Sequence, residues 1–304
     1  MIQPPPLKSG DTVAIVSTAR KVTKAELQPT VKILESWGLQ VKFGKNLFKA
    51  SNQFAGTDEE RLADLQSALN NKNVQAILFA RGGYGTVRII DGVNWKRFQK
   101  DPKWLIGYSD ITVLHNHLHR HLDLESIHAP MAFNLPKLSA NCLDVFKDTI
   151  FGKTLRYTSS KQSSVAEKLN RKGQASGILT GGNLSILYSI MGSQSDVDTA
   201  GKILFLEDLD EYVYHIDRMM MNLARNNKLS QLAGLIVGGM SEMRDNEIPF
   251  GKTAEEIIRE AVEPYDYPVL FGFPAGHIPN NFPLILGRKV TLNVTEKMDL
   301  KFHA

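Results

Sequence analysis

Short apolar strands that alternate with amphipathic helices are the feature that most restricts the fold of this chain. A buried strand is predicted at Thr12–Ser17, and further strands are predicted at Leu39–Phe43 and Val74–Ala80. The helix before the third strand begins with the capping-box sequence Thr57–Glu60, and an earlier helix ends near Trp37. Such alternation favours an α/β fold with a doubly wound parallel sheet, whose working residues lie in loops at the carboxyl ends of the strands.

The helix that ends near Trp37 contains one conflict, because Pro29 falls inside its apolar pattern. Proline is tolerated in the first turn of a helix, but farther along it removes a hydrogen bond and bends the axis. Two alternatives therefore remain open: the helix begins at about Pro29, or it is kinked there.

The length and composition of the chain restrict both its organisation and its partners. A chain of 304 residues with 42% hydrophobic residues favours two domains with ordinary cores. The 36 Lys and Arg residues nearly balance the 32 Asp and Glu residues and are interspersed with them, so nucleic acid is not an expected partner. A single cysteine, Cys142, excludes an internal disulfide and a cysteine-based zinc cluster. With no signal-like segment and no long apolar run, we expect a cytoplasmic protein without a membrane partner.

A polar stretch at residues 151–176, centred on Ser159–Ser164, is the expected crossing between two domains. The prediction is an α/β N-terminal domain at residues 1–150 and a C-terminal domain at residues 151–304. Four further apolar strands are predicted in the second half, at Gly177–Thr180, Lys202–Asp208, Gly234–Gly239 and Pro268–Phe273.

The run Trp104–Thr112 suggests a catalytic serine. An apolar strand ends on Gly107-Tyr108-Ser109-Asp110, and a helix is expected to follow. In a nucleophile elbow, a sharp turn of this kind exposes the serine Oγ, and the next backbone N–H faces the substrate carbonyl. Ile111 occupies the second glycine position of the usual motif, so the alternative is a helix that is simply N-capped by Ser109 or Asp110.

The loop Arg81–Gly85 directly follows the third strand and is therefore expected at the ligand-facing edge of the sheet. Its glycine order does not match either common phosphate-binding motif, which makes a nucleotide site the weakest interpretation. The glycines could instead form a plain tight turn, or their N–H groups could face the Ser109 turn and stabilise an oxyanion.

A serine nucleophile needs a base, and the base needs an orienting group. His277 follows a glycine shortly after an apolar strand, and Glu207 ends a strand that is otherwise wholly apolar. A carboxylate at such a position is costly to bury unless it accepts strong hydrogen bonds. Asp208 and Asp210 compete with Glu207 for the orienting role on spacing alone.

Four histidines lie at alternate positions of the helix expected after Ser109: His115, His117, His119 and His121. Pairs four residues apart could bind a metal ion, but the glutamate of the metalloprotease motif is absent. We therefore interpret these residues as packing or surface histidines, and no metal ion or cofactor is expected.

With these candidates in place, the chain resembles the serine LD-carboxypeptidase family, which includes muramoyltetrapeptide carboxypeptidases and microcin C immunity peptidases. The resemblance extends over nearly the whole chain and rests on six motifs in the same order. These are Arg81–Gly85, Ile106–Asp110, Thr180–Leu184, Phe205–Asp208, His215–Met219, and Gly276–His277 followed by Pro283–Gly287.

The resemblance implies a triad of Ser109, Glu207 and His277 and an amidotransferase-like N-terminal domain beside a smaller, β-rich C-terminal domain. It also implies a homodimer, and a murein tetrapeptide as substrate, cut between the L-centre of its diamino acid and the terminal D-Ala during peptidoglycan recycling. Two groups of residues are expected to assist. The backbone N–H groups of Asp110 and of Gly82 or Gly83 would bind the oxyanion, and Arg81 and Asn183 would bind substrate.

Two other functions remain as alternatives. An immunity-type peptidase would cleave peptidyl-nucleotide antibiotics, but no obvious additional aromatic loop lies between Gly182 and Glu207. A non-catalytic ligand-binding protein on the same scaffold would be expected to lack one of the three triad residues, and all three are present.

Overall fold

The computed structural model describes residues 1–159 and 168–303. It divides into two compact units. The first consists of Met1–Lys153 and Pro279–Leu284, and the second of Thr154–Ile278 and Ile285–Ala304. A short segment from late in the chain thus belongs to the first unit, whereas the sequence analysis assigned all of residues 151–304 to a second domain. Part of the polar crossing segment, residues 160–167, lies outside the described residues.

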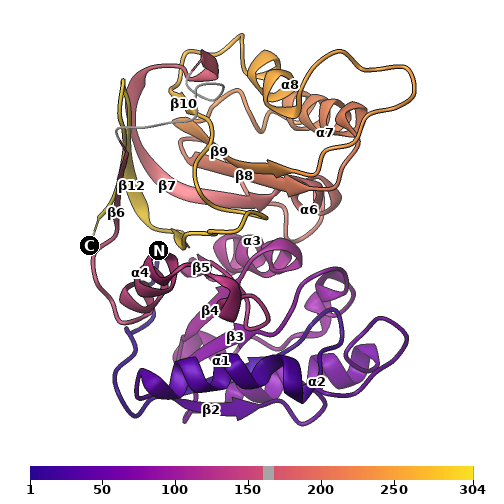
Figure 1. The fold of residues 1–304 in the computed structure, drawn as a ribbon, viewed down its shortest axis with the longest axis vertical. Helices are drawn as coiled ribbons and strands as arrows, with labels where there is room; N and C mark the ends of the chain where they lie inside the picture. The colour runs from indigo at the N-terminus through magenta and orange to yellow at the C-terminus, as the bar shows by residue number, and fades with distance from the viewer. Residues whose placement is uncertain (160–167, 304) are drawn as a thin grey trace. The chain divides into compact units, whose positions relative to one another are not determined.

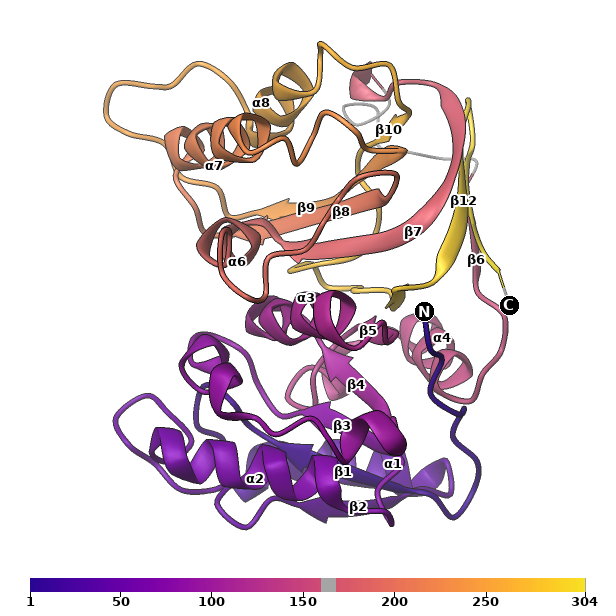
Figure 2. The ribbon, with the colours of Figure 1, turned by 180° about the vertical axis from the view of Figure 1, so that it is seen from behind.

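The first unit is built on the predicted parallel sheet, which runs in the order β11-β5-β4-β3-β1-β2 (Figures 1 and 2). Four neighbouring pairs, from β2 to β5, are parallel. The strands are β1 (Thr12–Val16), β2 (Gln40–Phe43), β3 (Ala76–Phe79), β4 (Trp104–Gly107), β5 (Ser126–His128) and β11 (Leu284–Leu286), whose first residue, Leu284, ends the late segment of this unit. The helices are α1 (Lys24–Ser36), α2 (Asp58–Asn70), α3 (Thr112–His121) and α4 (Ala140–Ile150). The doubly wound α/β prediction is therefore confirmed for this unit.

Local sequence explains where α1 and α2 begin. Thr57 caps α2 in the predicted capping box with Glu60. An equivalent box, formed by Thr23 and Glu26, starts α1 well before Pro29, which lies inside the helix. The alternative in which this helix begins at Pro29 is therefore wrong, because the reciprocal hydrogen bonds of the cap fix an earlier start.

The second unit contains a mixed sheet in the order β10-β9-β8-β7-β12-β13-β6. Strands β7 to β10 pair in parallel, whereas β12, β13 and β6 add antiparallel neighbours. The strands are β6 (Arg156–Ser159), β7 (Gly173–Asn183), β8 (Ile203–Leu209), β9 (Gly234–Ser241), β10 (Val269–Leu270), β12 (Lys289–Val294) and β13 (Met298–Phe302). The unit is thus β-rich, as the resemblance implied.

Three helices cover the parallel part of this second sheet (Figure 2). They are α6 (Leu184–Ser189), α7 (Val213–Arg225) and α8 (Ala254–Ala261). Leu206, Ile216 and Ile257 are among the fully buried side chains of the core between helices and strands. This core packs against β8, the strand that carries Glu207. None of the helices in the described ranges has the length and apolar composition that a bilayer-crossing segment needs.

Candidate active site

The serine of the candidate site lies in a strained turn between β4 and α3. Ser109 has a φ of +61°, a left-handed conformation that a side chain adopts only when surrounding structure enforces it. Gly107 makes the turn possible, since a Cβ there would lie 2.8 Å from Ile111. Neither Ser109 nor Asp110 caps α3, whose N-cap is Ile111 without a side-chain bond. The structure therefore has the geometry of a nucleophile elbow rather than that of a simple capped helix.

A buried histidine is hydrogen-bonded to the backbone of this turn. His115 Nε2 lies 2.9 Å from the carbonyl oxygen of Gly107, and Nδ1 lies 2.8 Å from Ser126 Oγ. Because a carbonyl can only accept, Nε2 carries the proton and Nδ1 accepts from the hydroxyl. Burial lowers the pKa of His115 to about 4, so the ring stays neutral. The sequence left packing and surface positions open for His115, and its bond to the Gly107 carbonyl could not be predicted from spacing.

The glycine loop lies against the serine. A Cβ on Gly82 would sit 3.3 Å from Ser109 Cβ and 3.4 Å from its Oγ. Gly83 has a φ of +114°, and a Cβ there would lie 2.6 Å from the Arg20 side chain. Bare backbone at these positions therefore allows the loop to approach the Ser109 turn closely.

Asp110 connects the nucleophile turn to the residue that follows the glycine loop. Its side chain is buried, and Oδ2 accepts hydrogen bonds from the Thr86 backbone N–H at 2.9 Å and from the Thr86 hydroxyl at 2.6 Å. Burial raises the pKa of Asp110, although the two Thr86 bonds act in the opposite direction. The structure thus brings Ser109, Gly82, Gly83 and Asp110 together within the first unit.

In the second unit, Glu207 and His277 form a hydrogen-bonded pair. Glu207 is completely buried at the end of β8, and its Oε2 lies 2.7 Å from His277 Nδ1. The His277 backbone N–H donates to the same oxygen at 3.1 Å. Burial acts to lower the pKa of His277, but the Glu207 carboxylate outweighs it, and the pKa lies above its usual value.

Gly276 is the residue that permits this approach. It has a φ of +109°, and a Cβ there would lie 2.7 Å from both Cβ and Oε2 of Glu207. The glycine before His277 is therefore required both by its backbone conformation and by the space that Glu207 occupies.

The three neighbouring acids have different partners. Asp208 is buried and accepts from Asn183 Nδ2 at 2.8 Å and from the Ser185 N–H at 2.9 Å. Burial, together with the charge of Glu207, raises the pKa of Asp208 to about 7. Asp210 forms an ion pair with Arg244. Of these acids, Glu207 is the one hydrogen-bonded to His277.

The two candidate substrate-binding side chains have neighbours of their own. Asn183 is buried, and its side-chain oxygen caps α6 by accepting from the Ile186 N–H at 3.1 Å. Arg81 stacks on Phe133, with its guanidinium carbon 4.5 Å from the ring centroid. The role of both residues in substrate binding stays a prediction.

The histidines of α3 pack inside the first unit. His115, His117 and His119 are buried, and the His117 ring stacks on Trp95 with centroids 5.4 Å apart. Across residues 1–159 and 168–303, no group of three His, Cys, Asp or Glu side chains is arranged to hold a metal ion. The packing interpretation of these histidines is therefore confirmed for the three buried residues.

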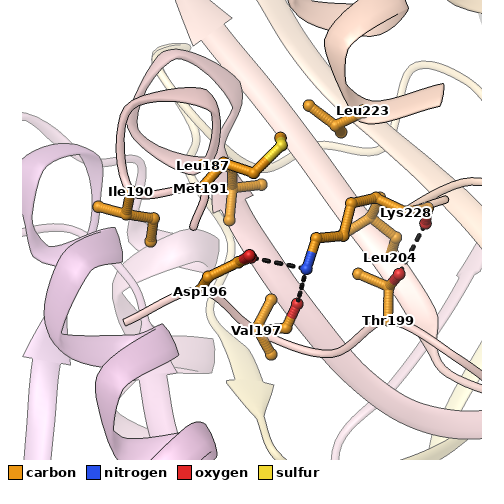
Figure 3. A pocket seen from close by; sticks show the side chains of 9 residues that line it. All are labelled: Leu187, Ile190, Met191, Asp196, Val197, Thr199, Leu204, Leu223 and Lys228. Carbon is orange, nitrogen blue, oxygen red and sulfur yellow. Dashed lines mark hydrogen bonds and ion pairs between the residues drawn. The ribbon is translucent and has the colours of Figure 1, made fainter. Parts of the chain in front are cut away.

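A small pocket in the second unit lies apart from these residues (Figure 3). It is mostly apolar, and the Lys228 ammonium at its edge pairs with Asp196 at 2.7 Å and donates to the Val197 carbonyl at 2.8 Å. The space of about 20 Å³ is enough for roughly one water molecule. This pocket is too small for a peptide substrate.

Comparison with known proteins assigns the chain to a family. The model of the LD-carboxypeptidase N-terminal domain matches residues 13–129, and that of the LD-carboxypeptidase C-terminal domain matches residues 176–292. The chain therefore belongs to the LD-carboxypeptidase family, a family of peptidase-type hydrolases.

Named relatives match over nearly the full length of the chain. A probable murein peptide carboxypeptidase of Bacillus subtilis is 36% identical, covering 97% of this chain and 92% of the relative. The murein tetrapeptide carboxypeptidase of Pseudomonas aeruginosa is 30% identical, covering 92% of each chain. Among solved structures, muramoyltetrapeptide carboxypeptidase from Oxalobacter formigenes is 28% identical with a TM-score of 0.86, covering 96% of this chain and 99% of that chain.

The microcin C7 self immunity protein MccF shares the fold at lower sequence identity. It is 22% identical with a TM-score of 0.88, covering 100% of this chain and 99% of that one. At this sequence identity the similarity establishes a shared fold and does not establish a shared activity.

Proposed function

We propose that this chain is a serine LD-carboxypeptidase that removes the terminal D-Ala from murein tetrapeptides. The bond cut is the amide between the L-centre of the diamino acid and D-Ala. The observation that carries the proposal is the buried Glu207 hydrogen-bonded to His277, in a chain that also holds Ser109 in a strained elbow. The names of the Bacillus and Pseudomonas relatives support the substrate class.

In the proposed mechanism, the Ser109 Oγ attacks the amide carbonyl carbon while His277 Nε2 takes the hydroxyl proton. Glu207 holds the Nδ1–H tautomer and stabilises the imidazolium that forms. The tetrahedral oxyanion is bound by the backbone N–H groups of Asp110 and of Gly82 or Gly83. His277 then protonates the D-Ala nitrogen, the C–N bond breaks, and an ester to Ser109 remains.

Hydrolysis of that ester completes the cycle. His277 takes a proton from water, the hydroxide attacks the ester carbonyl, and the alkoxide of Ser109 leaves and regains the proton from His277. The products are free D-Ala and the tripeptide acid. We further propose that Arg81, which directly precedes the glycines of its loop, contacts the terminal carboxylate of the substrate, and that Asn183 also binds substrate.

The first test is release of D-Ala from L-Ala-D-Glu-meso-diaminopimelate-D-Ala, with EDTA present. We expect release by the wild type and none by Ser109→Ala. Ser36→Ala is a suitable control, because this serine of α1 is exposed and donates to the carbonyl of Ile33 within its own helix at 2.7 Å. Release by Ser109→Ala would rule out the serine mechanism. Cleavage of a peptidyl-nucleotide but not of the tetrapeptide would favour an immunity-type peptidase instead.

The proposal extends to location and assembly. A role in recycling murein peptides requires the enzyme to act in the cytoplasm, and the family resemblance implies a homodimer. Cell fractionation and light scattering of the purified chain test these two points separately. A secreted protein or a monomer at micromolar concentration would contradict the corresponding part of the proposal.

A further inference from the structure

A buried arginine links two loops of the first unit. The Arg61 side chain, carried by α2, is completely inaccessible to solvent. Its guanidinium donates to the carbonyl oxygens of Thr18 and Gly85, the latter at 3.1 Å, and forms an ion pair with Asp58. It also lies over the Phe54 ring, 4.7 Å from the centroid. Burying a guanidinium is costly unless its donors are satisfied, so these loop carbonyls are integral to its position.

Two buried threonines continue the connection. Thr18 Oγ1 and Thr86 Oγ1 lie 2.7 Å apart, and Thr86 Oγ1 donates to Asp110 Oδ2 at 2.6 Å. Because the Thr86 hydroxyl proton is used on the carboxylate, Thr18 must donate to Thr86. Each hydroxyl therefore donates to the next group, from Thr18 to Thr86 and from Thr86 to Asp110, the residue after Ser109.

This chain of bonds reaches both sides of the predicted oxyanion site. Gly85 ends the glycine loop, and Asp110 directly follows Ser109. Gly82 and Gly83 have no side chains that could fix their backbone by packing, so the hydrogen bond that Arg61 donates to the Gly85 carbonyl contributes to the geometry of the loop.

We propose that Thr86 and Arg61 are positioning residues, which hold the glycine loop and the Asp110 turn in the arrangement that oxyanion binding requires. The inference rests on the proposed serine mechanism and adds to it the residues that fix the oxyanion donors. Neither side chain needs to touch the substrate. Their effect on the rate comes from the placement of backbone N–H groups, for which a displacement of about 1 Å can cost 10²-fold.

The closest test of Thr86 is a pair of substitutions. Thr86→Val keeps the shape but removes the hydroxyl, whereas Thr86→Ser keeps the hydroxyl and loses only a methyl group. For Thr86→Val we expect kcat to fall about 10- to 100-fold with KM changed by less than about threefold, because the loss is confined to the transition state. Thr86→Ser should retain most of the wild-type kcat.

Two further variants separate positioning from stability. Arg61→Lys keeps the charge but replaces two guanidinium nitrogens, one facing the Thr18 and Gly85 carbonyls and the other facing Asp58, by a single ammonium nitrogen, so it should also lower kcat. Thr149→Val removes a buried hydroxyl of the same unit that bonds within α4, to the Val145 carbonyl at 2.7 Å. This control should change the melting temperature, but kcat measured at temperatures below the melting transition should stay at the wild-type value.

Labelling of Ser109 by a fluorophosphonate, measured beside D-Ala release, distinguishes this inference from the proposed function. The phosphonyl oxygen occupies the oxyanion site during attack, so Thr86→Val should slow labelling by a factor similar to the fall in kcat. Equal labelling rates in Thr86→Val and wild type would overturn the inference alone. Labelling without D-Ala release would refute only the proposal that the murein tetrapeptide is the substrate. The labelling rates of Thr86→Val and wild type would still decide the role of Thr86. An unlabelled wild type would overturn both the inference and the nucleophile assignment.

Discussion

One carboxylate oxygen, Oε2 of Glu207, accepts hydrogen bonds from both the backbone N–H and the ring Nδ1 of His277, at 3.1 and 2.7 Å. The backbone bond fixes the position of the loop, and the ring bond fixes the tautomer and the direction of the imidazole. The proton on Nδ1 leaves Nε2 as the basic nitrogen that the proposed mechanism uses.

Glu207→Gln should separate orientation from charge. The amide keeps the approximate size of the side chain but removes the negative charge that stabilises the imidazolium, so kcat should fall by about 10²–10⁴. D-Ala release by single-turnover kinetics measures the loss. Glu263→Gln removes an exposed carboxylate that pairs with Arg259 in the same unit and should leave the rate unchanged. A Glu207→Gln enzyme with near-wild-type kcat would refute the orienting role.

The pH profile should report the raised pKa of His277. Catalysis needs the neutral ring, and burial is outweighed by Glu207 so that the folded pKa lies above 6.5. The value of kcat/KM should therefore rise with pH through an apparent pKa above 6.5. In Glu207→Gln the residual activity should show its inflection at lower pH, because the raising charge is absent. The same inflection in both enzymes would show that Glu207 does not control this titration.

Gly276→Ala should disrupt the pair without altering either partner. The new methyl group would meet Glu207 at 2.7 Å, and the φ of +109° is unfavourable for alanine. We expect kcat to fall by about 10² or more, because the His277 ring is displaced. Gly192→Ala is the matched control, with a φ of +77° and no atom within 4 Å of its Cβ. It should cost about 1 kcal/mol in stability through φ alone and leave kcat intact.

Ser109→Gly and Ser109→Ala should differ in stability, although both lack the nucleophile. At a φ of +61°, alanine retains the strain of the left-handed conformation and glycine does not. The glycine variant should therefore be more stable than the alanine variant by about 1 kcal/mol in urea unfolding. Equal free energies of unfolding would indicate that the turn in solution is not strained.

His115→Gln should make the first unit less sensitive to acid. The folded pKa of His115 is about 4 against 6.5 in the unfolded chain, so stability is full above pH 6.5 and is lost as the pH falls toward 4. The loss amounts to about 3 kcal/mol from this residue. Glutamine can still donate to the Gly107 carbonyl but does not titrate. Urea unfolding at pH 7.5 and pH 5 should show a smaller difference for the variant than for the wild type; an equal difference would contradict this.

Sequence patterns predict four strands of the first sheet, β1 to β4, because three of them are apolar runs and helix signals lie between them; the three-residue strands β5 and β11 are not predicted. The capping box at Thr57 is one such signal, and it is confirmed. The same motif at Thr23 and Glu26 determines where α1 begins, through two reciprocal hydrogen bonds. A proline later in the pattern does not move that start, because the cap precedes it.

The strands in the second half of the chain are predicted less completely. The run Pro268–Phe273 was predicted as a strand, but only Val269–Leu270 pair as β10, while β12 and β13 were not predicted. These later strands alternate buried and exposed residues over five or six positions, a weaker signal than a wholly apolar run.

Among the site residues, spacing alone could not choose between Glu207, Asp208 and Asp210. Each lies near the end of β8, and only the three-dimensional course of the Gly276 turn brings His277 to Glu207. The roles of Arg61 and Thr86 at the loops cannot be predicted from sequence, because the partners that matter there, the Gly85 carbonyl and Asp110, lie 24 residues away along the chain.

The return of Pro279–Leu284 to the first unit, two residues after His277, has a consequence for the ancestry of such chains. A single recombination breakpoint near Lys153 would join residues 1–153 of one protein to the remaining residues of another. The first unit of the hybrid would then contain a Pro279–Leu284 segment from a different parent than the rest of that unit. Exchange of one complete half therefore requires breakpoints on both sides of Pro279–Leu284 as well. Inheritance as one block, with the histidine and the returning segment travelling together, is the simpler course.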